Sequence, residues 1–121
     1  MKNYLQFINE SEQMKDIIIT IPSTIKWEDY QKELDDVVNK NLIMNFKVSN
    51  FPTKAGVGSK CYLCYKGNII GWMNICGFTE KEFTCETTGK IWKGKFIERS
   101  GVFNKIEPIP YKGFQGYRYI N

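Results

Sequence analysis

One segment of the sequence, residues 61–78, restricts the choice of folds more than any other. It contains two apolar runs, CYLCY at 61–65 and IIGWMNICGF at 69–78, and the short link Lys66-Gly67-Asn68 joins them. Two such runs around a short glycine-containing link are typical of a β-hairpin. We therefore expect a chain organised around antiparallel strands.

The remaining segments predict short strands and one helix. Residues 27–39 place apolar side chains at helical spacing, and Glu28 and Asp29 lie in the first turn, where the helix dipole favours negative charge. The apolar side chains of this helix are Trp27, Tyr30, Leu34, Val37 and Val38. Apolar runs bounded by turn residues predict strands at 16–22, 41–48, 82–87, 90–98 and 117–120, with a turn at Thr88-Gly89 and an irregular or edge segment at 101–110, where Pro108 and Pro110 lie.

Five or six short strands and one main helix predict an α+β fold, a small mixed β-barrel with the helix across one end. At 121 residues the chain fits one domain, residues 1–121. Residues 1–12 contain neither a long apolar run nor a signal-peptide cleavage site. No stretch has the roughly 20 apolar residues of a membrane span. We therefore expect a cytoplasmic protein that does not bind a membrane.

Charge is divided unevenly along the chain. Residues 1–50 hold six lysines against eight acids, whereas residues 51–121 hold eleven Lys or Arg against five acids. Within the second half, basic, aromatic and glycine residues interleave over residues 84–119. This mixture suits a surface that stacks flat rings and neutralises phosphates, so it predicts an anionic ligand. A solvated basic surface without a partner is the alternative.

Candidate ligand-binding residues follow from this pattern. We expect aromatic side chains to form a pocket for a base, and basic side chains beside it to hold phosphates. The expected pocket consists of Trp72, Trp92, Phe114 and Tyr117, and the expected cations are Lys90, Lys93, Lys95, Arg99 and Arg118. Lys112 and Gln115 lie in the same segment, with the amide of Gln115 able to read a base edge. Lys60 and Tyr62, outside this segment, are also expected ligand-binding residues. The alternative is that the tryptophans belong to the core and that residues 112–118 form a closing turn, with Phe114 and Tyr119 packed into the barrel.

Histidine is absent, which removes Ser-His-Asp and Cys-His catalysis and most catalytic zinc sites. An enzyme would need a Lys/Glu or Asp/Glu pair as acid and base, and Lys93 or Lys95 with Glu98 is the best available. Because such residues at alternate strand positions are more often solvated charges, we expect no catalytic residues. We also expect no cofactor.

The four cysteines allow two interpretations. Cys61-x-x-Cys64 is one half of a zinc-site pattern, with Cys76 and Cys85 as the other half. However, Tyr62-Leu63 favours an extended strand, in which residues three apart point to opposite faces. We therefore expect buried thiols and no metal site.

The run from Gly58 to Phe78, GSKCYLCYKGNIIGWMNICGF, resembles a segment of the PUA-like superfamily, which includes the EVE, ASCH, YTH and PUA domains. In that segment a strand of the K-x-Y-L kind is followed by a turn and a strand beginning x-I-I-G. These places are occupied by Lys60, Tyr62, Leu63, Ile69, Ile70 and Gly71. The resemblance covers residues 41–120 and implies a β-barrel that binds RNA or holds a nucleobase, often a modified one, in an aromatic-lined pocket. The ASCH motif G-x-K-x-x-E-x-R is not matched, because Gly94 to Arg99 form the shorter run GKFIER.

Three functions are consistent with the sequence. The first is a non-catalytic PUA-like domain that binds RNA, single-stranded DNA or a nucleotide-like ligand. The second is a small protein-binding or inhibitor module that presents its basic surface to an acidic protein. The third is an ASCH-like hydrolase or nuclease that uses Lys95 and Glu98.

Overall fold

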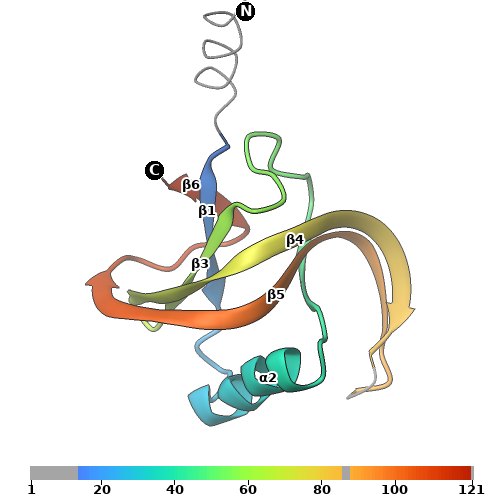
Figure 1. The fold of residues 1–121 in the computed structure, drawn as a ribbon, viewed down its shortest axis with the longest axis horizontal. Coiled ribbons are helices and arrows are strands. Elements are labelled where there is room, and N and C mark those ends of the chain that lie inside the picture. Colours follow the sequence, from blue (N-terminus) through green and yellow to red (C-terminus); the bar gives the residue numbers. More distant parts are fainter. Residues whose placement is uncertain (1–13, 86–87, 121) are drawn as a thin grey trace, which may run out of the picture.

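The computed structural model describes residues 14–85 and 88–120, which contain one helix and six strands (Figure 1). The elements are β1 (Asp16–Ile21), α2 (Trp27–Asn39), β2 (Met44–Val48), β3 (Lys60–Tyr65), β4 (Asn68–Thr84), β5 (Ile91–Pro110) and β6 (Tyr117–Ile120). The helix has the predicted bounds. Residues 1–12 and the last two residues of the predicted strand 82–87 lie outside the described residues.

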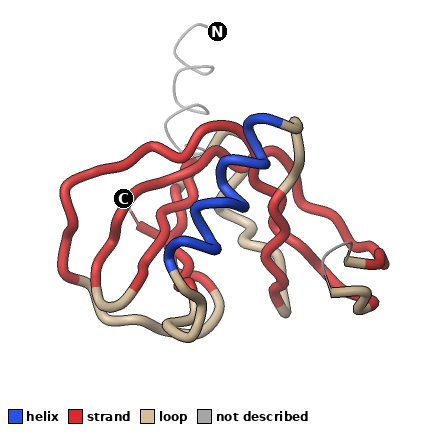
Figure 2. Tube along the Cα trace, turned by 90° about the horizontal axis from the view of Figure 1, so that it is seen from below, coloured by secondary structure: helices blue, strands red, loops and turns tan. Residues whose placement is uncertain are grey.

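All six strands form one sheet in the order β2-β5-β4-β3-β1-β6. Strands β1 and β3 are parallel, and every other neighbouring pair is antiparallel. The sheet curls into a half-barrel with β2 and β6 at its two edges, and α2 lies across one end (Figures 1 and 2). The prediction of an α+β, barrel-like fold with one main helix is confirmed at this level.

The hairpin predicted at residues 61–78 is present. Its turn residues Lys66 and Gly67 have φ values of 48° and 83°, the left-handed values that a two-residue type I′ turn requires. Glycine adopts such values without a steric cost, which explains its place in the link.

The prediction of separate short strands after residue 69 is wrong. Strand β4 is 17 residues long and pairs with the 20-residue β5 along its whole length, so the segment 101–110 is part of a strand. Register shifts next to Ile70, Met73 and Cys76 interrupt the pairing. Such bulges bend a long hairpin, which lets β4 and β5 arch around the body of the molecule (Figure 1). We call the far part of this hairpin, Thr79–Thr84 with Ile91–Phe96, the arm.

The main core lies between α2 and one face of the sheet, which we call the inner face. Tyr30, Leu34 and Val37 of α2 are buried against strand residues of β1, β3, β4 and β5. Val38, predicted as part of the same apolar face, is 47% exposed. It lies beside the buried stripe because only one side of the helix contacts the sheet.

A smaller cluster lies on the opposite face, which we call the outer face. It is formed by Ile18, Cys64 and Ile69, and the rings of Tyr111 and Phe114 pack against it. Cys61 belongs to the inner cluster and Cys64 to the outer one, so the two thiols point to opposite faces as predicted for a strand. Both are buried free cysteines, which confirms the expectation of buried thiols for this pair. Burial raises the pKa of Cys61 to about 11, which keeps that thiol neutral at ordinary pH.

Candidate functional site

The structure distributes the predicted ligand residues over three places. A group on the outer face consists of Lys60, Tyr62, Trp72, Phe114 and Arg118, with Lys112 and Gln115 exposed on the adjoining loop. Trp92, Lys93 and Lys95 lie on the arm, and Lys90 immediately precedes its second strand. Arg99 and Tyr117 face the inner core.

The outer-face group is a direct result of strand alternation and register. Tyr62 of β3 lies opposite Trp72 of β4, and the Nζ of Lys60 lies 4.6 Å from the centroid of the Trp72 ring. Residues two apart on one strand share a face, which places Lys60 and Tyr62 side by side. Strand alternation therefore puts Lys60 and Tyr62 on one face, and the register with β4 brings Trp72 beside them.

The C-terminal segment extends the same face. Phe114 is held over it by a hydrogen bond from its backbone N–H to Oγ1 of Thr20, at 3.2 Å. The Cζ of Arg118 lies 4.5 Å from the centroid of the Phe114 ring. Phe114 is thus both a packing residue of the outer cluster and the support of an exposed guanidinium.

The expected pocket of Trp72, Trp92, Phe114 and Tyr117 is not assembled. Trp92 pairs with Phe83 on the arm, eleven residues along β4 from Trp72, whereas Trp72 lies beside Lys60 on the outer face. Tyr117 packs against the inner core and makes an edge-on contact with Tyr119. The two tryptophans therefore cannot contact one small ligand.

Arg99 is the most deeply placed of the predicted cations. Its side chain is 3% exposed, and its Nη1 donates a hydrogen bond to Oη of Tyr30 at 3.2 Å. Its Nε has no hydrogen-bond partner among the described atoms. Arg99 follows the inward-facing Ile97 by two residues, so alternation directs it to the core.

Glu98 has a different partner from the predicted lysines. Its carboxylate forms an ion pair with Lys81 and accepts a hydrogen bond from the hydroxyl of Thr79. The hydrogen bond from Lys81 holds the pKa of Glu98 below its usual value, and Thr79 adds to this effect. Gly77 leaves room for the carboxylate, since a Cβ there would lie 2.4 Å from Oε1 of Glu98. Glu98 thus links β5 to the start of the arm through Lys81 and Thr79.

A cavity that the sequence did not predict opens at the inner face, next to the start of α2. Its volume is about 460 Å³, and it is lined by Trp27, Gln31, Tyr65, Ile70, Phe103 and Lys105. The ring of Trp27 lies 5.6 Å from that of Tyr65 and 6.0 Å from that of Phe103, between centroids. We call these six residues the aromatic pocket.

The aromatic pocket is held in shape by contacts outside it. The hydroxyl of Tyr65 donates a hydrogen bond to the backbone carbonyl of Ile25 at 2.6 Å, which fixes its ring beside Trp27. Phe103 reaches the pocket because Gly71 has no side chain: a Cβ there would lie 2.4 Å from Cζ of Phe103 and 2.5 Å from the carbonyl oxygen of Asn104. The rings are therefore set in place before any ligand arrives.

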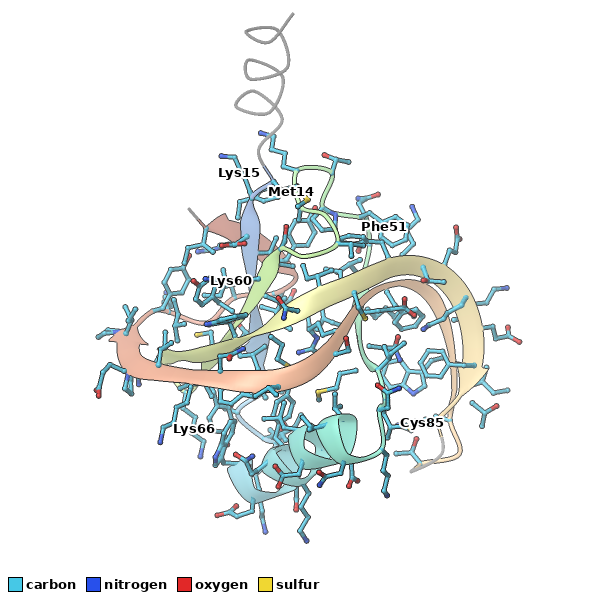
Figure 3. All side chains as sticks on the ribbon, in the orientation of Figure 1. Met14, Lys15, Phe51, Lys60, Lys66 and Cys85 are labelled. Carbon is cyan, nitrogen blue, oxygen red and sulfur yellow. The ribbon has the colours of Figure 1, made fainter. Side chains whose placement is uncertain are left out.

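Charge at the rim of the aromatic pocket is positive. The ammonium group of Lys105 belongs to its lining, and Nζ of Lys66 lies 5.3 Å from the centroid of the Tyr65 ring. Figure 3 shows Lys66 at the end of the molecule where α2 begins. The amide of Gln31 contributes its carbonyl oxygen as an acceptor, while its NH2 group donates a hydrogen bond to Oδ1 of Asp35 at 3.2 Å and has a second N–H to offer.

A second cavity, of about 350 Å³, lies between the far end of α2 and the arm. Its lining combines apolar side chains with two acids and includes Trp92, Phe83, Phe96 and Cys85. Figure 3 shows Cys85 near that end of the helix. Glu33 and Asp36 make this rim negative, which does not suit the anionic ligand that Trp92 was predicted to stack.

Neither metal ligands nor a membrane helix is found in the described parts of the chain. Residues 14–85 and 88–120 contain no group of three or more Cys, Asp or Glu side chains that could hold a metal ion. Their single helix is not long and apolar enough to cross a membrane.

Comparison with known proteins gave no match. No protein-family model matches the chain, and searches of curated proteins and of solved structures each found no similar protein.

Proposed function

We propose that this protein binds a nucleobase or nucleotide in the aromatic pocket, as a non-catalytic domain of the PUA-like kind. The observation that carries the proposal is the group of Trp27, Tyr65 and Phe103 around one cavity of about 460 Å³. Ligand pockets have volumes of about 300 to 1,000 Å³ and combine aromatic walls with a few polar groups. The one-helix, curled-sheet architecture also supports the resemblance on which the PUA-like part of the proposal rests.

The polar groups favour a flat ring that carries a negative charge. A base can stack on an aromatic ring, the Gln31 amide can bond its edge, and Lys105 can neutralise a phosphate. An aromatic pocket can also bind a quaternary ammonium group. The ammonium groups of Lys105 and Lys66 oppose that alternative, since they would repel a cation.

The proposal is tested by calorimetric titration with a panel of nucleoside 5′-monophosphates. Lys105→Ser removes the charge at the rim and should weaken binding of every member about tenfold. Gln31→Ala should weaken binding unequally among the bases, because it removes an edge contact. Lys32→Ser, an exposed change on the same helix, is the matched control. If no monophosphate binds, or if the three variants behave alike, the proposal fails.

A further inference from the structure

The outer face places aromatic and basic side chains in one row across the sheet. The paired positions Arg118, Ile18, Tyr62, Trp72 and Asn104 lie in register on β6, β1, β3, β4 and β5. Neighbouring strands are about 4.8 Å apart, so this row is about 19 Å long. It lies on the opposite side of the sheet from the aromatic pocket.

Two cations on the outer face, Arg118 of the row and Lys60 beside it, lie directly over rings. Nζ of Lys60 lies 4.6 Å from the centroid of Trp72, and Cζ of Arg118 lies 4.5 Å from the centroid of Phe114. The carboxylate of Asp16, beside Lys60, already accepts a hydrogen bond from the Lys60 backbone N–H at 2.8 Å. The outer face therefore offers a ring next to a positive charge at two places, Trp72 with Lys60 and Phe114 with Arg118.

We propose that the outer face is a docking surface for single-stranded nucleic acid, which goes beyond the binding of one base in the aromatic pocket. In single strands the base faces are accessible, so bases stack on Trp72 and Tyr62 while phosphates contact Lys60 and Arg118. Four-stranded sheets with exposed aromatic side chains bind two or three RNA bases in this way. Ile18, in the middle of the row, is fully buried, so the rings that could take bases here are those of Tyr62 and Trp72 on one side and Phe114 on the other. A duplex hides its base faces, so the rings favour a single strand over a duplex.

The test measures fluorescence anisotropy of a labelled 12-nucleotide single strand at 50 and 200 mM salt. The double variant Lys60→Ser, Arg118→Ser should weaken binding about tenfold at low salt and should lower the salt slope by about 1.4, since each phosphate contact contributes about 0.7 on a single strand. Lys90→Ser, Lys93→Ser removes the same charge from the arm and is the matched control. Equal loss in both double variants, or the same affinity for a matched duplex, would overturn the proposal.

Trp72 gives an independent measurement. Trp72→Leu should weaken the single strand about tenfold without changing the salt slope, and Trp72→Tyr should restore most of the affinity because a ring remains. Circular dichroism verifies that each variant is folded. If Trp72→Leu folds and binds as well as the unchanged protein, bases do not stack there and the proposal is wrong.

The two proposals fail separately. Nucleoside monophosphates report on the aromatic pocket, where Lys105→Ser acts, and the 12-nucleotide strand reports on the outer face, where Lys60→Ser, Arg118→Ser acts. Strand binding that is sensitive to the outer-face variant, without binding of any monophosphate, would support the outer face and reject the pocket. The opposite result would reject the outer face alone.

Discussion

Arg99 and Arg118 are the same residue type with the same predicted role, yet they occupy opposite faces of one sheet. Arg99 is 3% exposed and bonds Tyr30 of the helix, whereas Arg118 is exposed and lies over Phe114. A phosphate can reach Arg118 without any change in the fold, but Arg99 would first have to leave the core. The role of a basic side chain on a strand therefore depends on the face of the sheet to which it points.

The largest expected effect tests the inner member of this pair. Arg99→Ala removes a buried side chain and leaves the Tyr30 hydroxyl without its donor, so it should lower the free energy of unfolding by about 3 kcal/mol. Arg118→Ala should change it by less than about 0.5 kcal/mol. Urea unfolding measures both, and equal losses would contradict the division into two faces.

A second variant separates charge from packing at the same position. Arg99→Met keeps much of the volume and removes a buried charge that is costly to desolvate. It should therefore be clearly more stable than Arg99→Ala. If both variants are equally unstable, the guanidinium itself stabilises the core.

The next effect concerns the glycines that make room for other groups on β4. Gly71→Ala forces its Cβ against the Phe103 ring and the Asn104 backbone, so we expect a loss of about 2 kcal/mol and a distorted aromatic pocket. In Gly77→Ala the close atom is the far end of Glu98, which can move, so the loss should be smaller. Thermal unfolding compares the two, and the reverse order would show that Phe103 is not fixed over Gly71.

A smaller effect is expected at the ion pair of the arm. Because hydrogen bonds from Lys81 and Thr79 lower the pKa of folded Glu98, its contribution is present above the unfolded value, about 4.3, and is lost as the pH falls through the lower folded value. Glu98→Gln should cost about 1 kcal/mol at pH 7 and nothing at a pH below that folded value. Unfolding at a series of pH values measures this, with the exposed Glu80→Gln as the control. A cost that does not depend on pH would exclude the charge as its origin.

The last comparison is between two adjacent valines of the helix, and it includes the smallest effect expected, at Val38. Val37 is buried against the sheet, and Val37→Ala should lower stability by about 1 to 2 kcal/mol. Val38 is 47% exposed, and Val38→Ala should be neutral within about 0.5 kcal/mol. Chemical unfolding measures the free energy of unfolding of the two single variants. A loss at Val38 as large as that at Val37 would mean that another surface covers this side of the helix.

Part of the candidate binding surface could be predicted because it depends only on neighbours in sequence. Lys60 and Tyr62 are two apart on one strand, and the predicted hairpin brings Trp72 opposite Tyr62. The aromatic pocket could not be predicted in the same way. Its three rings come from the start of α2, the end of β3 and a bulged part of β5, which no spacing in the sequence relates.

Local sequence patterns are sufficient to specify the helix at 27–39, the hairpin turn at Lys66 and Gly67, and the alternation that separates Cys61 from Cys64. These features depend on local backbone preferences and on a period of two or 3.6 residues, which a single segment contains. Three other features depend on the assembled fold: β4 and β5 continue as one arched hairpin, Arg99 is buried, and Phe103 lies over Gly71. Those outcomes depend on bulges and on packing between distant segments, because only the assembled sheet determines which side chains share a face or a cavity.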